Sequence, residues 1–265
     1  GKEIPIAKIP LNDKKTFRLL ARGESIGVFQ LESEGMRRYL KGLKPTNLSD
    51  IIAMVALYRP GPMELIPDYI SGKHGRKTIR YLHPKLKPIL HDTYGIAVYQ
   101  EQVLQIAQQI AGYTLGEADI LRKAIGKKIK KLLVQQEKKF IEGAMKNGIA
   151  KPVAEKIFSF IEPFASYGFN RAHAACYGTI AYQTAYLKAH FPSAFMAALL
   201  TSEQNNLDKI AIVVKETQRL GIKVLPADVN ESFVDFGVIR GRRDYIRFGL
   251  AAIKNVGRGV AEAIV

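Results

Sequence analysis

The sequence predicts a mainly α fold, and three observations lead to that prediction. Apolar residues recur with a helical period through most of the chain before Gly221. Prolines and glycines divide these periodic segments, as in Arg59-Pro60-Gly61-Pro62, where neither proline can donate a backbone N–H. After Gly221 the pattern changes to short strand-like stretches, which indicates a small mixed α/β subdomain.

The individual elements follow from these patterns. Helices are expected over residues 13–20, 33–43, 48–57, 102–110, 117–124, 134–146, 153–161, 173–190, 194–202 and 207–220. Residues 27–31 and 95–100 have the character of short strands, and residues 68–94 are expected to be rich in loops. Strands are expected over 222–225, 234–239 and 245–250, the last two paired across Gly241-Arg242-Arg243.

Positive charge dominates the composition, with 40 Lys and Arg against 24 Asp and Glu and a formal net charge of +16. Such an excess favours a polyanionic partner, with DNA or RNA first. The single cysteine, Cys176, excludes an internal disulfide framework and fits a reducing cytoplasm. No signal peptide and no apolar run of bilayer length is recognisable, so a soluble protein is expected. Both ends are expected to be cut from a longer protein.

One stretch, from Tyr167 to Tyr177, combines a helix start with groups that bind anions. In a helix beginning at Asn170, His173 and Tyr177 share one face with Asn170, and Arg171 lies about 100° away. Free backbone N–H groups, a positive helix end, a guanidinium and an aromatic ring together suit a nucleoside triphosphate. The alternative is structural: a capping asparagine, a packed histidine and a core aromatic residue.

Basic runs form a second candidate region. Cations follow one another between residues 122 and 131 with no acid among them: Arg122, Lys123, Lys127, Lys128, Lys130 and Lys131. Their mutual repulsion favours a neutralising phosphate partner. The run from Lys73 to Lys77 is either a solvated loop or a phosphate contact, and Arg59, His74 and Gln100 have either packing or functional roles.

A series of longer motifs runs through the chain. They are Val28-Phe29-Gln30-Leu31-Glu32-Ser33 with Gly35-Met36, Ala56-Leu57-Tyr58-Arg59-Pro60-Gly61-Pro62, Lys73-His74-Gly75-Arg76, Tyr94-Gly95-Ile96-Ala97-Val98-Tyr99-Gln100-Glu101-Gln102-Val103, Leu121-Arg122-Lys123-Ala124-Ile125-Gly126-Lys127-Lys128, Tyr167-Gly168-Phe169-Asn170 with His173 and Tyr177, and Leu225-Pro226-Ala227-Asp228-Val229-Asn230. In this order the motifs resemble the α subunits of bacterial DNA polymerase III, the C-family replicative DNA polymerases. The resemblance covers nearly the whole chain.

The resemblance implies a multi-helix fingers domain, a small α/β subdomain and the start of a helix-hairpin-helix element at Val256 to Ala261. The implied boundaries are a palm-to-fingers connection over residues 1–20, the helical body of the fingers over 21–203, the mixed subdomain over 204–248 and a truncated helix-hairpin-helix over 249–265. Glycines in that hairpin let backbone amides approach a DNA phosphate without a Cβ in the way.

The implied activity is that of a DNA-directed DNA polymerase, a nucleotidyltransferase of DNA replication, of which this fragment alone is expected to be inactive. The resemblance assigns the incoming nucleotide (dNTP) to Arg122, Lys123, Asn170, Arg171, His173 and Tyr177. It assigns DNA, more loosely, to Lys127, Lys128, Lys130, Lys131, Lys73, Arg76, Gly257, Arg258 and Gly259. The implied location is the cytoplasm, in association with the nucleoid.

The implied cofactor is Mg²⁺, held by palm aspartates that would precede Gly1. Within the chain, the acid pairs Glu32/Glu34 and Glu117/Asp119 are better explained as helix-start acids than as metal ligands. The implied partners are template-primer DNA, dNTP and, mostly through regions outside this chain, the sliding clamp, the clamp-loader τ subunit and a proofreading exonuclease, but no membrane. Two alternatives remain open: a stand-alone basic DNA-binding module without catalytic context, and a fragment of an error-prone translesion paralogue.

Overall fold

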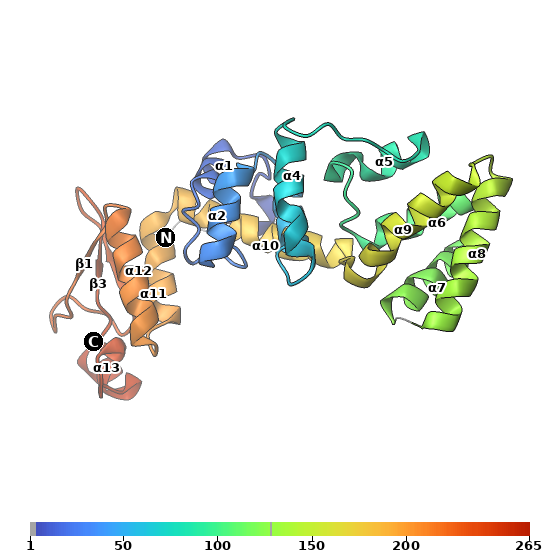
Figure 1. Ribbon diagram of the computed structural model, residues 1–265. Helices are drawn as coiled ribbons and strands as arrows, with labels where there is room; N and C mark the ends of the chain where they lie inside the picture. Colours follow the sequence, from blue (N-terminus) through green and yellow to red (C-terminus); the bar gives the residue numbers. More distant parts are fainter. Residues whose placement is uncertain (1–3, 128) are drawn as a thin grey trace. The chain divides into compact units, whose positions relative to one another are not determined.

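The computed structural model describes residues 4–127 and 129–265 and is mainly α-helical, with one three-stranded sheet (Figure 1). The predicted fold class is therefore confirmed. The chain forms two compact units, a terminal unit of residues 1–44 and 181–265 and a central unit of residues 45–180. The finer domain boundaries expected from the sequence stay predictions.

The described residues of the terminal unit contain six α-helices or parts of α-helices and the sheet. They are α1 (Lys14–Ala21), α2 (Glu34–Leu43), residues 181–190 of α10 (Arg171–His190), α11 (Pro192–Ser202) and α12 (Leu207–Arg219), and a short helix, α13 (Arg258–Ile264), follows the sheet. The first two begin where the sequence supplies a cap. The Asp13 carboxylate accepts from the Thr16 N–H at 2.7 Å, and the Ser33 hydroxyl accepts from the Met36 N–H at 3.3 Å.

The sheet has the strand order β1-β3-β2, with β1 (Lys223–Leu225), β2 (Gly237–Ile239) and β3 (Tyr245–Arg247). The predicted hairpin is present, because β2 and β3 are antiparallel with Val238 opposite Ile246. β1 is parallel to β3, with Val224 opposite the same Ile246. Ile246 is fully buried and packs in one core cluster with residues of α11 and α12, so the sheet and these helices share a hydrophobic core.

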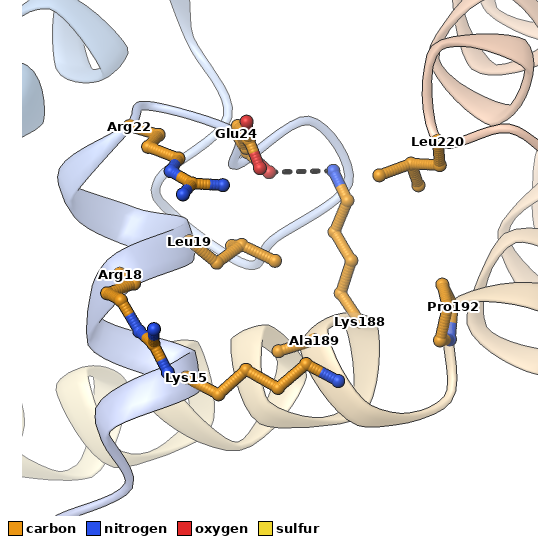
Figure 2. Close-up of a pocket in the computed structure, with 9 residues that line it drawn as sticks. All are labelled: Lys15, Arg18, Leu19, Arg22, Glu24, Lys188, Ala189, Pro192 and Leu220. Atoms are coloured by element: carbon orange, nitrogen blue, oxygen red, sulfur yellow. Dashed lines mark hydrogen bonds between the residues drawn. The ribbon is translucent and has the colours of Figure 1, made fainter.

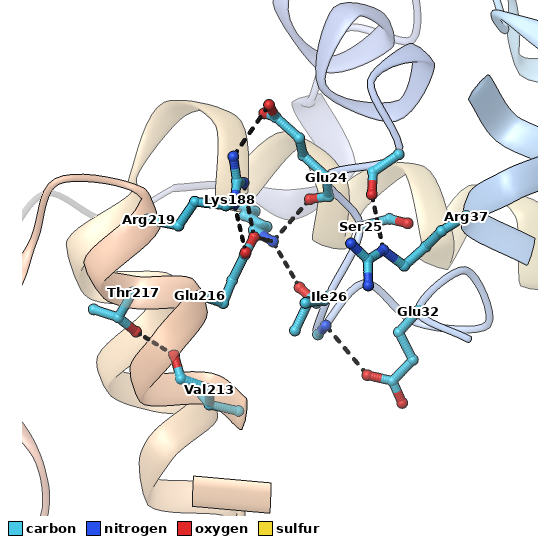
Figure 3. Close-up of polar contacts among 12 residues, drawn as sticks. Glu24, Ser25, Ile26, Glu32, Arg37, Lys188, Val213, Glu216, Thr217 and Arg219 are labelled. Atoms are coloured by element: carbon cyan, nitrogen blue, oxygen red, sulfur yellow. Dashed lines mark hydrogen bonds and ion pairs between the residues drawn. The ribbon is translucent and has the colours of Figure 1, made fainter. Parts of the chain in front are cut away.

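A buried ion pair joins sequence-distant parts of the terminal unit (Figure 3). The Lys188 ammonium, on α10, donates to the Glu216 carboxylate at 2.7 Å and to the backbone oxygens of Glu24 and Ile26 at 2.8 Å each. Arg219 closes the network with bonds to Glu216 and Glu24. A cavity between α1 and the last turn of α10 lies beside this network (Figure 2).

The central unit is built around a bundle of four helices. They are α6 (Gln100–Ala111), α7 (Leu115–Gly126), α8 (Lys130–Lys146) and α9 (Lys151–Tyr167). Their apolar faces share one core that includes Phe140 and Phe158, whose ring centroids lie 5.5 Å apart. A Cβ on Gly143 would lie 2.2 Å from the Ala111 carbonyl oxygen, so glycine permits the close approach of α8 to the end of α6.

The rest of the central unit comprises α3 (Leu48–Leu57), α4 (Ile66–Lys73), the single turn α5 (Lys87–Leu90) and residues 171–180 of α10. Gln102 ties α5 and α6 together. Its side-chain oxygen accepts from the N–H groups of Val98 and Tyr99, and its side-chain nitrogen donates to Ile89 and Thr93. Every polar atom of this buried amide thus contributes to the fold.

Three local expectations were wrong. Residues 27–31 form successive turns, with Val28 N–H bonded to Ser25 and Leu31 N–H to Val28, because the turns bury Val28 and Leu31 without a partner strand. Residues 68–94 are more helical than expected: Gly72 lies inside α4, where its missing Cβ makes room for Tyr94. Residues 95–100 make a single bridge, between Tyr99 and Phe169, before α6 begins at Gln100.

Among residues 4–127 and 129–265, no helix combines the length and the apolar character needed to cross a bilayer.

Candidate functional site

The entry into α10 is fixed by pairing with a segment far away in the sequence. Phe169 N–H donates to the Val98 oxygen at 3.1 Å, and Gln100 N–H donates to the Phe169 oxygen at 3.0 Å. These bonds make the parallel bridge between Tyr99 and Phe169. The first turn of α10 is thereby held beside the first turn of α6.

Two side chains cap α10. The Asn170 side-chain oxygen accepts from the His173 N–H at 2.8 Å, which confirms the predicted N-cap. The carboxylate of Glu101, on α6, accepts from the Arg171 N–H at 3.0 and 3.1 Å. Of the N–H groups expected to be free for an anion, the described structure leaves only that of Ala172 without an acceptor in this turn. The negative charge of Glu101 already lies at the positive end of the helix.

Aromatic rings form a short row of tilted contacts on one side of the α10 start. The ring centroids of His173 and Tyr177 lie 4.3 Å apart with planes inclined by 42°, and those of Phe169 and His173 lie 5.3 Å apart. His173 is exposed and Tyr177 half-buried. The expected shared face of His173 and Tyr177 is therefore present.

Guanidinium groups lie against two rings of this region. The Arg171 guanidinium carbon is 5.5 Å from the centroid of Tyr99, a buried residue, and that of Arg59 is 4.4 Å from the centroid of Phe169. The Arg59 Nε also donates to the Ala56 oxygen at the end of α3, and burial lowers the pKa of Arg59. Arg59 thus supports the Phe169 segment. Of the two roles left open by the sequence, packing and function, the structure shows the packing role.

The cations at the end of α7 have an acidic partner that the sequence argument left out. The Asp119 carboxylate binds Arg122 Nη2 at 2.7 Å and Lys123 Nζ at 2.8 Å. The bonds from Lys123 and Arg122 lower the pKa of Asp119, so both cations face a fixed negative charge. The signal was present in the sequence, because Asp119 precedes them by three and four residues.

The remaining cations of this run lie at the α7–α8 connection. Lys127 follows the last residue of α7, and Lys130 and Lys131 open α8; all three are exposed. The first turn of α8 contains no acid and Ile129 provides no side-chain cap, so Lys130 and Lys131 oppose the positive end of their own helix. The predicted contact residue Lys128 lies outside the described residues.

The basic run of residues 73–77 divides between the fold and the solvent. The Lys73 ammonium is 2.7 Å from the Asp50 carboxylate, and the two side chains are only 8% and 2% exposed. Lys77 pairs with Asp68 at 2.8 Å in solvent. Arg76 is exposed, with no acidic partner among the described residues. The geometry gives Lys73 a structural role, and its contact with DNA stays a prediction.

The C-terminal residues predicted to contact DNA lie at the start of α13. Gly257 is the N-cap, and no heavy atom lies within 4 Å of a Cβ built on Gly257 or Gly259. Arg258 pairs with Asp235 at 3.1 Å and with Glu262 at 3.1 Å. The backbone here is open to a phosphate, whereas the guanidinium is partly engaged.

The described structure shows no contact that joins the cations of α7 to those of α10. Arg122 is held by Asp119, and Arg171 lies against Tyr99. Their convergence on one triphosphate stays a prediction. Sequence reasoning gave no role to Glu101 or Phe169, and it interpreted Asp119 only as a helix-start acid.

Carboxylates do not gather into a metal site in the described part of the chain, where no group of three or more His, Cys, Asp or Glu side chains could hold an ion. Glu117 forms a capping box with Thr114 at the start of α7 and binds Lys139 at 2.6 Å. Glu32 accepts from the Gly27 N–H at 3.2 Å, and Glu34 lies in the first turn of α2. The structure thus gives helix-start or local roles to the acids that were weighed as metal ligands.

Comparison with known proteins identifies the family. A family model described as the bacterial DNA polymerase III alpha subunit finger domain matches residues 1–148, and one described as a helix-hairpin-helix motif matches residues 221–265. The DNA polymerase III subunit alpha of Thermus aquaticus is 52% identical over 270 residues, which cover 100% of this chain and 22% of the relative. That of Halalkalibacterium halodurans is 51% identical, covering 100% of this chain and 24% of the relative.

The same subunit of Escherichia coli is 49% identical over 99% of this chain and 23% of the relative. The chain therefore spans between a fifth and a quarter of the length of these relatives. Because the finger-domain match covers more than half of the sequence, the chain belongs to the bacterial DNA polymerase III alpha subunit finger-domain family.

Proposed function

We propose that this chain is the fingers portion of a DNA polymerase III α subunit. In the full-length protein it would bind the incoming dNTP and the template-primer DNA during DNA-templated 5′–3′ synthesis. The observation that carries the proposal is the start of α10, whose first two turns bring an asparagine cap, an exposed histidine and a half-buried tyrosine beside an arginine. Membership of the finger-domain family supports this assignment over a stand-alone DNA-binding module.

In this proposal Arg171 and His173 capture the triphosphate. A guanidinium binds phosphate oxygens in a bidentate manner, and a histidine N–H donates to a further oxygen. The contact between His173 and Tyr177 restricts both rings, so less rotamer entropy is lost on binding. Tyr177 would then pack against the nascent base pair, where a flat ring accepts each correct pair and penalises distorted ones.

Arg122 and Lys123 would take part by exchanging their present partner. Both now bind Asp119, and a triphosphate offers more negative charge than a single carboxylate. Such an exchange costs less than it would for a buried pair, because the Asp119 side chain is 37% exposed and its carboxylate regains water.

DNA binding is assigned to exposed groups that can contact backbone phosphates without fixing the position of the protein along the DNA. These groups are Lys127, Lys130 and Lys131 at the α7–α8 connection, Arg76 after α4, and the backbone of Gly257 and Gly259 with Arg258. The assignment extends to Lys128 and Lys73 from the sequence alone. Contacts of this kind supply affinity that depends strongly on salt and little on sequence.

The described residues of this chain do not fit a two-metal site. Mg²⁺ bound elsewhere in the full-length protein would neutralise charge on the phosphates. The part of this chain in the proposed reaction is therefore to bind and orient the nucleotide and the DNA.

The test is Arg171→Ala in the full-length α subunit. Loss of a charge-assisted hydrogen bond costs about 1.5–3 kcal/mol, so we expect the Kd for dNTP in single-turnover incorporation to rise about 10- to 100-fold. The Kd for template-primer DNA should stay within about twofold. Arg38→Ala is the matched control, because Arg38 also lies over a tyrosine ring, that of Tyr39, at 5.8 Å. Unchanged incorporation kinetics for Arg171→Ala would remove the site assignment.

The isolated 265-residue chain provides a second test of the division of labour. It should bind a labelled primer-template in fluorescence anisotropy and should not extend the primer in the presence of Mg²⁺ and dNTP. Primer extension by the isolated chain would contradict the proposal.

A further inference from the structure

A cavity of about 350 Å³ lies in the terminal unit, away from the residues assigned to nucleotide or DNA (Figure 2). One wall is α1 with its C-cap residue: the helix contributes Lys15 and Arg18, and Arg22 follows its last residue. The cavity is at the lower end of the usual volume for small-ligand pockets, about 300–1,000 Å³. It has room for a single nucleotide but not for a segment of duplex.

Three cations lie along the wall formed by α1 and its C-cap residue. Lys15, Arg18 and Arg22 follow one another at i, i+3 and i+7, which places them on one face of the helix. All three are exposed, and none has an acidic partner among the described residues. Cations in the last turn of a helix are expected from the helix dipole, but Lys15 lies in the first turn, where a cation is unfavourable. An anion in the cavity would offset this repulsion.

The other side of the cavity is apolar, with Ala189 at the end of α10, Pro192 at the start of α11 and Leu220 after α12. Leu19 adds an apolar group from α1. Figure 2 shows Leu220 and Pro192 on the opposite side of the cavity from the three cations. The N-terminal end of α11, whose first turn contains no acid, adds positive potential near Pro192.

The two other charged residues at the cavity are already neutralised. Lys188 binds Glu216 at 2.7 Å, and the Glu24 carboxylate accepts from Arg219 at 3.2 Å. The charge left to the cavity is therefore that of the α1 cations. A ligand that matches both sides of the cavity therefore has a phosphate group, which the cations bind, and an apolar face, which packs against the apolar side.

We propose that this cavity binds a nucleotide, with its phosphate on Lys15, Arg18 and Arg22 and its base or sugar against Leu19, Ala189, Pro192 and Leu220. A free nucleotide and one unit of a single-stranded DNA share this chemistry. The proposal goes beyond the function assigned to α10 and stands on the chemistry of the cavity itself.

The first experiment locates the ligand on α1. The amines of the 265-residue chain are acetylated with and without saturating dTMP, oligo(dT) or inorganic phosphate, and the modified lysines are quantified by mass spectrometry. We expect modification of Lys15 to fall at least about threefold with dTMP or oligo(dT). Its exposed neighbour Lys14, which does not line the cavity, is the internal control and should be unchanged. Protection by dTMP indicates a free nucleotide, and protection by oligo(dT) alone indicates a strand.

The second experiment measures affinity for labelled oligo(dT). The variant Lys15→Gln/Arg18→Gln/Arg22→Gln should bind at least about tenfold more weakly, and the slope of log K against log salt should fall by about 2, since each single-strand phosphate contact contributes about 0.7. The control Lys14→Gln/Arg242→Gln/Arg243→Gln removes the same charge from exposed positions outside the cavity. Circular dichroism checks that both variants are folded.

Unchanged reactivity of Lys15 at saturating ligand would overturn the proposal, as would equal loss of affinity in the two triple variants. Protection by inorganic phosphate equal to that by dTMP would overturn the nucleotide assignment. Arg171→Ala, which probes α10, should leave the protection of Lys15 unchanged, so the two proposals fail independently.

Discussion

The Lys188 network and the α7–α8 connection use positive charge in opposite ways. Lys188 is fully buried, and its ammonium group is bonded within the fold to Glu216 and two backbone oxygens (Figure 3). Lys130 and Lys131 are exposed, oppose the positive end of their own helix and have no acid in their turn. One arrangement stabilises the chain, whereas the other leaves positive charge available to a partner.

The comparison shows why a net charge of +16 is a poor count of binding groups. Lys73 and Lys188 look like any other lysine in the sequence, yet both are buried against carboxylates. Arg122 and Lys123 form an intermediate class, since they are paired with Asp119 but lie in partial contact with solvent. A cation is therefore a candidate for phosphate binding when the fold leaves it without an acidic partner or, as at Arg122 and Lys123, pairs it with a carboxylate that is exposed enough to be exchanged.

The largest effect is expected at Lys188. Burial lowers the pKa of Lys188, and the bond to Glu216 opposes that shift. Lys188→Ala leaves the Glu216 carboxylate, 3% exposed, without this partner, and removing one member of a buried pair costs about 3–5 kcal/mol. Arg219 still binds Glu216, so we expect the lower end of that range, about 3 kcal/mol, measured by urea unfolding.

Two variants sharpen this measurement. Lys188→Met/Glu216→Met replaces both charges with apolar groups. Its free energy of unfolding should lie within about 1 kcal/mol of that of the unmodified chain. Lys130→Ala, on the exposed side of the comparison, should change the free energy of unfolding by less than about 0.5 kcal/mol. If the free energy of unfolding of Lys188→Ala equalled that of the unmodified chain, the buried pair would contribute no more to stability than the exposed lysines do.

The next largest effect concerns DNA affinity. Lys127→Gln/Lys130→Gln/Lys131→Gln should reduce the slope of log K against log salt by about 2.7 for duplex DNA, at about 0.9 per phosphate contact, and weaken binding about tenfold. The control Lys138→Gln/Lys146→Gln/Lys156→Gln removes three exposed lysines elsewhere in the central unit. An equal change in both variants would show that the connection acts only through net charge.

How far the sequence predicts the molecule depends on the distance over which an interaction acts. The helices at 13–20, 33–43 and 48–57 were predicted nearly to the residue, because caps and prolines act within one turn. The cap of α10 by Asn170 was predicted for the same reason. Glu101 and Arg171 are separated by 70 residues, and Lys188 and Glu24 by 164, so no local pattern reveals either contact.

The site shows the same division. The pairing of Asp119 with Arg122 and Lys123 spans three and four residues, so it could have been predicted from the spacing of residues on one helix face. The contact of Arg59 with Phe169 could not be predicted in this way, because it joins the end of α3 to the start of α10. The strand expected at residues 27–31 was wrong for a further reason: a short apolar stretch can bury its side chains in turns as well as in a strand, as Val28 and Leu31 do here.

A smaller effect is expected at Glu101, which tests whether its carboxylate competes with the triphosphate. Glu101→Gln keeps an oxygen for the Arg171 N–H and removes the negative charge at the start of α10. We expect dNTP to bind about three- to tenfold more tightly in the full-length subunit. Glu162→Gln, an exposed acid on α9, is the control. Weaker dNTP binding by Glu101→Gln would mean that Glu101 supports the site rather than competing with the ligand.

The smallest effect is a pH dependence at Glu117. The bond from Lys139, followed by the Thr114 N–H, lowers the pKa of Glu117 from 4.5 to about 2. Because the folded-state pKa is depressed, the stabilisation is fully present above about 4.5 and is lost as the pH falls toward 2, where the native carboxylate takes up its proton. Glu117→Gln should flatten the free energy of unfolding over this window, and Lys139→Gln should flatten it in part, because the Thr114 bonds remain. An unaltered pH profile for Glu117→Gln would show that this solvent-facing pair, unlike that of Lys188, contributes nothing measurable to stability.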